Sequence, residues 1–268
     1  MIRTIRGIIF DIDGVLEFQG KVCSHAIETI EALRGAGVLV RFLTNSTLKS
    51  RASCAAKLRK RGFAVSDDEV FTACHLTARY LRGIGPRSCW VMVDGDGRDE
   101  FKEFPVDSEH PEYVVVGDNR SAFDFEHLNQ ALRMLRQGSK LVGMQAELLD
   151  TSMGSVELNV GAWVGMLEQA SGVQAVYIGK PSTFAFRTVL ASMALPSAQV
   201  AVVGDRVQTD IMGAQQLGIF TVLVQSGEFR KEDLQLGIRP DAIVENVGEL
   251  LRVLPDLPDA GARQADSR

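Results

Sequence analysis

Two aspartates end an apolar run near the amino terminus. The run Gly7–Phe10 reads GIIF, and Asp11 and Asp13 follow it with one residue between them. Burying a carboxylate costs several kcal/mol unless it is paired, hydrogen-bonded or bound to a cation. The pattern therefore predicts that another part of the chain, or a bound cation, compensates these carboxylates where the core strand ends.

Polar residues follow other apolar runs as well, and the carboxyl ends of parallel strands meet at one edge of an α/β sheet. Three or four carboxylates at that edge would repel one another, and the common relief is a hard cation with oxygen ligands, Mg²⁺ above all. A lysine and a hydroxyl there would suit an anion such as phosphate. The residues collected in this way are Thr44, Asn45, Ser46, Lys180, Asp205 and Asp210.

Most of these residues have a structural explanation when each is taken alone. The hydroxyl and amide residues at 44–46 could cap the helix that follows them. Asp210 could be an ordinary acid of a first helical turn, and Lys180 could be a solvated surface lysine. Only Asp11 and Asp13, after so apolar a run, favour a functional role by themselves, so the combination carries the argument.

Short apolar runs alternate with longer amphipathic stretches in both end regions of the chain. This rhythm predicts βαβ units and a doubly wound, mostly parallel α/β sheet of Rossmann-like type. The predicted strands are Gly7–Phe10, Val38–Leu43, Gln199–Val203, Thr221–Val224 and Asp241–Val244. The predicted helices are His25–Arg34, Ser50–Arg61, a helix from near Ser182, Asp210–Leu217 and Val247–Val253.

The middle of the chain predicts a separate inserted α/β domain, because a single sheet holding all the strands would be unusually wide. Its predicted strands are Cys89–Val93, Tyr113–Val116 and Lys140–Met144, with helices Phe125–Arg136 and Gly161–Gln169. The predicted organisation is a discontinuous core of residues 1–80 and 179–254, an inserted domain of residues 81–178, and a disordered tail of residues 255–268.

Composition narrows the class of protein. The 268 residues are 46% hydrophobic with a formal net charge of −5, which predicts a soluble globular protein and argues against nucleic acid or a membrane as partner. No window approaches the length of a transmembrane helix. Four cysteines without a C-x-x-C pair predict reduced core thiols and a cytoplasmic protein.

Four motifs in order resemble the haloacid dehalogenase (HAD) superfamily. They are D-x-D-G-V at Asp11–Val15, T-N at Thr44–Asn45, the lone Lys180, and G-D-x-x-x-x-D at Gly204–Asp210. The interval from Asp13 to Thr44 is too short for a cap domain, whereas the interval from Thr44 to Lys180 is ample. A cap between the second and third motifs is similar to subclass IIA, the group of NagD-like, nitrophenyl-phosphatase-like and phospholysine/phosphohistidine/pyrophosphate phosphatase-like proteins.

The resemblance implies a Mg²⁺-dependent phosphatase that hydrolyses a small phosphomonoester or related phosphoryl compound. Asp11 would attack phosphorus and form an aspartyl-phosphate, and Asp13 would act as general acid and then as general base. Mg²⁺ would be held by Asp11, the backbone carbonyl of Asp13, and Asp205, while Asp210 would bind through water or orient its neighbours. The phosphoryl oxygens would be held by Thr44, Asn45, Ser46 and Lys180.

The cap departs from the family pattern. This chain has Met144-Gln-Ala-Glu147 and Leu158-Asn-Val-Gly161 where many members have T-N-x-D and Gly-Pro-Gly segments. Since the cap covers the substrate in such enzymes, the sequence leaves the substrate open beyond a small phosphorylated metabolite. Candidate specificity residues in the cap are Glu147, Asp150 and Asn159, and the resemblance also implies homo-oligomerisation through the cap.

Three other functions stay open at this point. A phosphotransferase or phosphomutase would use the same core but pass the phosphoryl group to an alcohol or sugar. A 2-haloacid dehalogenase also uses a nucleophilic aspartate, although displacement of halide needs no proton donor at Asp13. A non-catalytic protein that binds phosphorylated ligands is the third alternative.

Overall fold

The computed structural model describes residues 4–121, 123–151 and 155–258. The chain divides into two compact units. The first unit comprises Met1–Thr44, Arg59–Val65 and Thr183–Arg268, and the second comprises Asn45–Leu58 and Ser66–Ser182. Most of the predicted disordered tail, residues 259–268, lies outside the described residues, and the domain boundaries predicted at residues 80 and 179 stay predictions.

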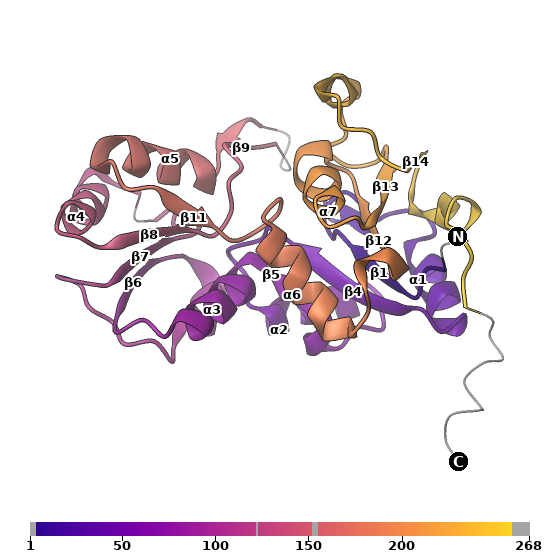
Figure 1. The fold of residues 1–268 in the computed structure, drawn as a ribbon, viewed down its shortest axis with the longest axis horizontal. Coiled ribbons are helices and arrows are strands. Elements are labelled where there is room, and N and C mark those ends of the chain that lie inside the picture. Colours follow the sequence, from indigo (N-terminus) through magenta and orange to yellow (C-terminus); the bar gives the residue numbers. More distant parts are fainter. Residues whose placement is uncertain (1–3, 122, 152–154, 259–268) are drawn as a thin grey trace, which may run out of the picture. The chain divides into compact units, whose positions relative to one another are not determined.

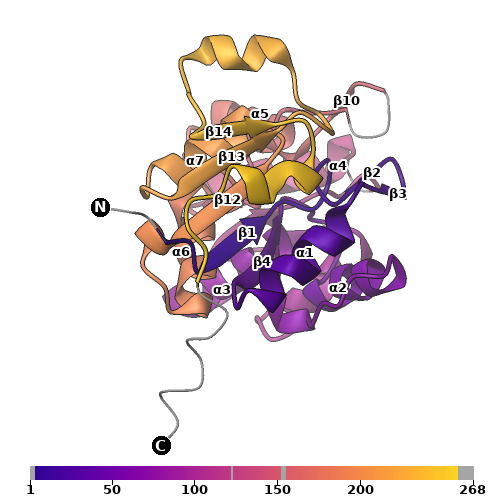
Figure 2. The ribbon, with the colours of Figure 1, turned by 90° about the vertical axis from the view of Figure 1, so that its right-hand side faces the viewer.

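The sheet of the first unit is parallel, as predicted. Its strands lie in the order β14-β13-β12-β1-β4 (Figure 2). Strands β1 and β12 are buried along their whole length, which explains their continuous apolar sequences. The bounds are β1 Gly7–Phe10, β4 Leu39–Thr44, β12 Val200–Gly204, β13 Phe220–Val224 and β14 Ala242–Val244.

Strand register brings the predicted site residues of this unit to one edge. Phe10, the last residue of β1, pairs with Val203 of β12 and with Phe42 of β4. The next residue, Asp11, donates its backbone N–H to the Val203 carbonyl at 2.9 Å. The residues that follow the ends of β1, β4 and β12 therefore leave the sheet at the same edge, which confirms the reasoning from parallel strands.

Two helices predicted for the first unit are present but are not regular α-helices over their whole length. The predicted helix Asp210–Leu217 is a π-helical turn, Val207–Ile211, followed by the short helix α7, Met212–Gln215. The wider turn packs Val207 and Ile211 against Leu223 of β13 while the Asp210 carboxylate accepts from the Arg206 amide. Such π turns are frequent at functional sites.

The predicted helix Val247–Val253 is a 3₁₀ helix over Val247–Arg252. Its two buried residues, Val247 and Leu250, are three positions apart, and the three-residue period of a 3₁₀ helix places both on one face. The helices α1 and α6 are close to their predicted bounds, at Ala26–Gly35 and Thr183–Met193. A small hairpin, β2 Glu17–Phe18 with β3 Lys21–Val22, was not predicted.

The second unit has its own parallel sheet, in the order β11-β8-β7-β6. Helices α4 and α5 cover one face of it, and α3 lies on the other face (Figure 1). Apolar side chains of β7, β8, α4 and α5 form a common core. The strands are β6 Cys89–Met92, β7 Tyr113–Val116, β8 Lys140–Gly143 and β11 Ala175–Tyr177, and the helices are α3 Ala73–Ile84, α4 Phe125–Arg136 and α5 Val160–Ser171.

Helix α3 was missed from the sequence although it carries ordinary end signals. Thr72 caps its start by accepting from the His75 amide at 3.2 Å, and Gly85 ends it in a left-handed conformation. The other elements of this unit are α2 Arg51–Lys60, which ends in the first unit, β5 Val70–Thr72, β9 Leu149–Asp150 and β10 Glu157–Leu158.

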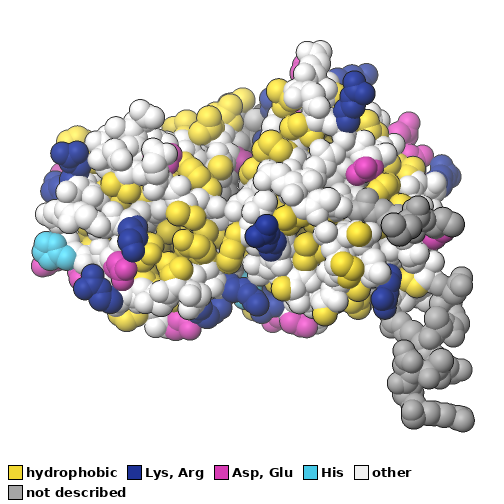
Figure 3. Space-filling view, viewed as in Figure 1, with side chains coloured by type: hydrophobic (Ala, Val, Ile, Leu, Met, Phe, Trp, Pro, Cys, Tyr) yellow, Lys and Arg dark blue, Asp and Glu magenta, His cyan; other side chains and the backbone are white. Residues whose placement is uncertain are grey.

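Surface and composition agree with a chain of small negative charge. On the face drawn in Figure 3, charged side chains of both signs are dispersed among apolar and uncharged ones. The four cysteines are free thiols. Among the described residues, no helix combines the length and the apolar character that a membrane crossing requires.

The start of α5 provides a test of the packing in the second unit. A methyl group at Gly161 would overlap the backbone carbonyl oxygen of Ala146, whereas one at Gly165 meets nothing within 4 Å. We expect Gly161→Ala to lower the free energy of unfolding by about 1–3 kcal/mol, because backbone must move to admit the methyl. Gly165→Ala should raise it by about 0.5–1 kcal/mol through helix propensity. Urea unfolding of both variants checks this, and equal effects would contradict it.

Candidate functional site

Three carboxylates of the first unit converge at the predicted edge of its sheet. Asp11, Asp205 and Asp210 each offer an oxygen, and these oxygens all lie within 4.8 Å of one another. The three residues are at most 7% exposed. They come from the ends of β1 and β12 and from the π turn after β12, and the sequence predicted that they converge at one sheet edge.

Asp205 is held in a narrow cradle of backbone. Its Oδ2 accepts from the Glu228 amide at 2.7 Å. Gly14 and Gly227 both have positive φ, and a methyl group on either would overlap that same oxygen. Two glycines are thus required for the chain to pass this close to the carboxylate.

Asp11 and Asp210 are oriented by local amides. The Ile12 amide donates to Asp11 Oδ1 at 2.8 Å. Asp210 Oδ2 accepts from the Arg206 amide at 3.2 Å and from the Thr209 hydroxyl at 3.3 Å. Each carboxylate is therefore fixed by neighbours on its own segment, before any ligand is considered.

The electrostatics of this group fit a divalent cation. Two charges 4.8 Å apart repel by about 3 kcal/mol at an effective dielectric constant of about 20, and the group contains three such pairs. The donors are all oxygens, which is the set that hard divalent cations prefer. Burial raises the pKa of the Cys23 thiol, and the charges of Asp205 and Glu17 raise it further. The group can hold a divalent metal.

Asp13 differs from Asp11 in its surroundings. Its side chain is exposed, whereas that of Asp11 is buried. Its backbone forms an isolated bridge with Glu17, and Gly14 then turns the chain with a φ of 86°. The two aspartates of the motif are therefore a buried member of the carboxylate group and a solvent-accessible acid.

Three predicted residues of the second unit, Asn45, Glu147 and Lys180, contact one another. Lys180 is 3% exposed. Its backbone N–H and its backbone carbonyl are both hydrogen-bonded to the side-chain amide of Asn45. The same amide donates to Glu147 at 3.0 Å. Thr44, at the end of β4, belongs to the first unit, so the predicted site residues divide between the two units, and each group is described within its own unit.

The loop of residues 45–50, which carries Asn45 and Ser46, is held by distant segments of the second unit. The Asp118 amide donates to the Thr47 hydroxyl at 2.9 Å, and the Gly97 amide donates to the Leu48 carbonyl at 3.2 Å. A methyl at Gly97 would overlap the Thr47 carbonyl, so the approach of the two backbones is close. The conformation of this loop depends on residues far along the chain.

Two carboxylates from the segment Gly95–Phe101 cap the start of α2. The Ser50 amide donates to Asp96 at 3.2 Å, and the Arg51 amide donates to Glu100 at 2.8 Å. The other Glu100 oxygen lies 3.2 Å from His75 Nδ1. Burial acts to raise the pKa of Glu100, but the hydrogen bonds from His75 and the Arg51 amide outweigh it, and the pKa is lowered. Negative charge at a helix start is favourable.

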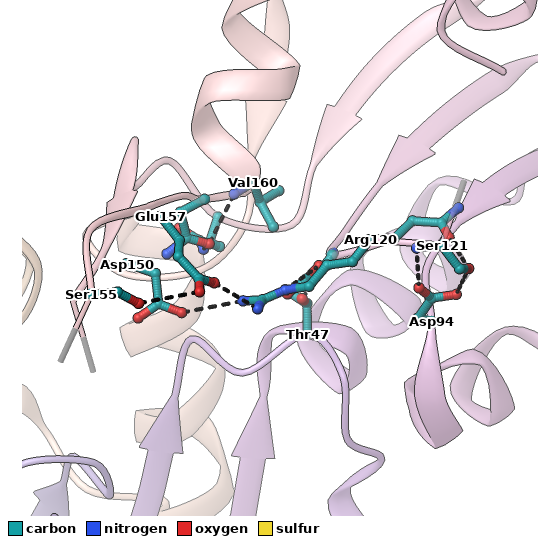
Figure 4. Close-up of polar contacts among 12 residues, drawn as sticks. Thr47, Asp94, Arg120, Ser121, Asp150, Ser155, Glu157 and Val160 are labelled. Carbon is teal, nitrogen blue, oxygen red and sulfur yellow. Dashed lines mark hydrogen bonds and ion pairs between the residues drawn. The ribbon is translucent and has the colours of Figure 1, made fainter. Parts of the chain in front are cut away.

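The other two cap candidates, Asp150 and Asn159, also make contacts within the second unit. Asp150 and Glu157, which face each other across the hairpin β9–β10, both point toward the guanidinium of Arg120 (Figure 4), at 3.4 and 2.8 Å. Arg120 also bonds Asp118 at 3.1 Å. Burial raises the pKa of Asp118, although Arg120 opposes it. Asn159 caps α5 by accepting from the Val160 amide at 2.8 Å.

The sequence did not single out Asp96 or Glu100. The run Asp94-Gly-Asp-Gly97 resembles part of a calcium loop, but position twelve of that loop is Pro105, so it is not an EF-hand. The glycines were the available signal, because two of them in four residues indicate a tight approach of backbone. Nothing in the sequence says which segment they approach.

Two family models match the chain. A haloacid dehalogenase-like hydrolase model matches residues 8–106, and a HAD-hydrolase-like model matches residues 177–250. Together they cover more than half of the sequence, including all four motifs. The chain belongs to the HAD superfamily.

Individual proteins place it more closely within the HAD superfamily. Human phospholysine phosphohistidine inorganic pyrophosphate phosphatase is 30% identical, over 93% of this chain and 94% of that protein. The 4-nitrophenylphosphatase of Thermotoga maritima has a TM-score of 0.87 at 27% identity, covering 92% of this chain and 97% of the other. NagD from E. coli K-12 has a TM-score of 0.84 at 28% identity, covering 92% and 98%. The chain is a HAD phosphatase of subclass IIA.

The carboxylates of Asp96 and Glu100 that cap the first turn of α2 give a prediction that needs no activity assay. We expect Glu100→Ala to speed hydrogen exchange at the Arg51 amide about 10-fold and to cost about 0.5–2 kcal/mol of stability, as the loss of a helix cap does. Asp124→Ala is the matched control, because Asp124 caps α4 and accepts from the His127 amide. It should cost similar stability and leave exchange over residues 46–51 unchanged. An unchanged Arg51 amide in Glu100→Ala would contradict the assignment.

Proposed function

We propose that this HAD phosphatase uses Mg²⁺ to hydrolyse a small phosphomonoester, or a related phosphoryl compound, through an aspartyl-phosphate on Asp11. The observation that carries the proposal is the convergence of Asp11, Asp205 and Asp210 at one sheet edge, buried and within 4.8 Å. Three buried acids at this spacing suit a divalent cation and a phosphate ester better than they suit a binding protein for uncharged ligands.

The metal would be held by side chains of Asp11 and Asp205 and by the backbone carbonyl of Asp13, with Asp210 orienting them. When bound, the cation offsets the negative charge of the phosphoryl oxygens and of the attacking carboxylate. Mg²⁺ is proposed because every donor is a hard oxygen. The glycine cradle around Asp205 keeps that carboxylate in position before the cation arrives.

The chain's own residues would carry two steps. In the first, an Asp11 oxygen bonds to phosphorus while the bond from phosphorus to the leaving oxygen breaks, and Asp13 gives that oxygen its proton. In the second, Asp13 takes a proton from water as the water oxygen attacks phosphorus, and the Asp11 carboxylate leaves. The exposure of Asp13 supports this role, because an acid that must exchange protons twice needs access to the leaving group and to water.

The phosphoryl oxygens would be held by the Thr44 hydroxyl, the backbone amide of Asn45, Ser46 and the Lys180 ammonium. These groups leave the ends of strands or precede helices, where donors and positive partial charge are available. The order of the motifs along the chain supports their acting together on one phosphoryl group.

The substrate class is a small phosphorylated metabolite. The relatives support phosphoryl compounds of several kinds, since one is named for phospholysine, phosphohistidine and pyrophosphate and another for 4-nitrophenyl phosphate. We further infer a cytoplasmic protein from the four free thiols, and self-association through the cap stays a prediction from the family.

The first prediction of this proposal concerns metal and nucleophile. Purified protein should release phosphate from 4-nitrophenyl phosphate with Mg²⁺ present, and EDTA should abolish turnover until Mg²⁺ is restored. Asp11→Asn should reduce turnover to background, because the amide is a poor nucleophile. Turnover without metal, or an active Asp11→Asn protein, would refute the mechanism. Glu126→Gln, on the exposed start of α4, is a control of matched charge change.

The second prediction concerns the general acid. Asp13→Asn should lower kcat by at least about 10²-fold, the usual contribution of positioned acid-base catalysis. Because Asp13 is exposed, the free energy of unfolding should change by less than about 0.5 kcal/mol. The loss should be larger for an alkyl phosphate, whose leaving oxygen needs the proton more, than for 4-nitrophenyl phosphate. Equal activity of wild type and variant on both esters would show that another residue is the acid.

A further inference from the structure

We propose that Glu147 is a positioning residue for Lys180 and acts through the side-chain amide of Asn45. The inference rests on the proposed function, in which the Lys180 ammonium holds a phosphoryl oxygen. Glu147 is a cap candidate for contact with substrate, and the inference gives it a different role, which is to set the place of the lysine backbone.

The side-chain amide of Asn45 forms hydrogen bonds with both backbone groups of Lys180. The Lys180 N–H donates to Asn45 Oδ1 at 2.8 Å, and Asn45 Nδ2 donates to the Lys180 carbonyl at 3.0 Å. The contact is close, because a methyl on the preceding residue, Gly179, would lie 2.5 Å from Asn45 Oδ1. A side-chain amide that satisfies both backbone groups of one residue fixes the position of that residue and its direction.

Glu147 adds a third contact that favours the observed orientation of the Asn45 amide. Its Oε2 accepts from Asn45 Nδ2 at 3.0 Å. An ionised carboxylate can only accept, so the NH₂ group must point toward Glu147 and the carbonyl oxygen must point toward the Lys180 N–H. The reversed amide would set oxygen against two acceptors and NH₂ against a donor. Glu147 thus reinforces the orientation that the Lys180 N–H and carbonyl also require, and it holds the Asn45 NH₂ group in place.

The position of Glu147 is fixed in turn from the start of α5. The Glu147 amide donates to Gln145 Oε1 at 2.7 Å, and Gln145 Nε2 donates to Asn159 Oδ1 at 2.5 Å. The Glu147 carbonyl accepts from the Gly161 amide at 2.9 Å. These supporting residues belong to the two cap segments in which this chain departs from the family pattern. The residues of these two segments therefore form a chain of hydrogen bonds that runs from Asn159 through Gln145, Glu147 and Asn45 to Lys180.

Burial makes the position of the lysine backbone matter. Lys180 is 3% exposed, so its side chain cannot adopt a new path when its backbone moves. A misplacement of about 1 Å at a group that acts on the transition state can cost about 10²-fold in rate. Loss of the Glu147 acceptor should therefore appear as a loss of catalysis that depends on Lys180.

The experiment is a double-mutant cycle on 4-nitrophenyl phosphate with Mg²⁺. We expect Glu147→Ala to lower kcat/KM about 10- to 100-fold. Glu147→Gln should stay within about 3-fold of wild type, because its amide oxygen can still accept from Asn45. In a Lys180→Ala background, Glu147→Ala should cause no further loss beyond about 2-fold. Additive losses, or Glu147→Gln as impaired as Glu147→Ala, would overturn the proposal.

Glu168 offers a matched control pair in the same unit. It is also half-buried, and its two oxygens accept from the Ala175 amide at 2.7 Å and the Tyr177 hydroxyl at 2.8 Å. Glu168→Ala and Glu168→Gln should lower stability as the Glu147 variants do and leave kcat/KM unchanged. If Glu168→Ala lowers kcat/KM as much as Glu147→Ala, the effect is general destabilisation and the proposal is wrong.

A second readout separates this inference from the proposed function. Hydrogen exchange at the Lys180 amide should accelerate about 10-fold in Glu147→Ala and in Asn45→Ala but not in Glu147→Gln or Glu168→Ala. This measurement needs no turnover, so a protein without phosphatase activity would still test the positioning. Unchanged exchange at Lys180 in Glu147→Ala would overturn the inference whatever the activity.

Discussion

Mutual repulsion among three buried carboxylates is the constraint on which the first unit depends. Asp11, Asp205 and Asp210 lie within 4.8 Å of one another at the end of a sheet whose strands are almost entirely apolar. Amide donors orient each acid, and Gly14 and Gly227 leave room for Asp205. These contacts have a common physical reason, because carboxylates that repel one another stay close together only where the surrounding backbone fixes their positions.

The second unit shows how a loop can be built by residues far from it in sequence. Residues 45–50 receive hydrogen bonds from the segments around Gly97 and Asp118, and Asp96 and Glu100 cap the helix that follows. Segments of the second unit around Gly97 and Asp118 therefore shape the loop of the second motif. This dependence gives a physical reason why changes within a cap could alter catalysis without touching a substrate.

Prediction from the sequence succeeded where a residue's environment follows from its own segment. The buried strands and the carboxylates that follow them were found in this way. It did not give the type of helix after Asp205, where a π turn that carries Asp210 precedes the short helix α7, or at Val247–Arg252, where a 3₁₀ helix suits the spacing of the buried residues. Helical periodicity cannot separate these turns, since their apolar residues are spaced almost alike.

The sequence by itself determined the family, the parallel α/β architecture and the identity of the core motif residues. Motif order and apolar runs are local properties, and a parallel sheet brings its strand ends to one edge whatever else the chain does. Only the tertiary structure decided that the Asn45 side chain forms hydrogen bonds with the Lys180 backbone and that Glu147 accepts a hydrogen bond from the same amide. Such contacts join residues about a hundred or more positions apart, and their geometry depends on how separate segments pack, which residue spacing does not encode.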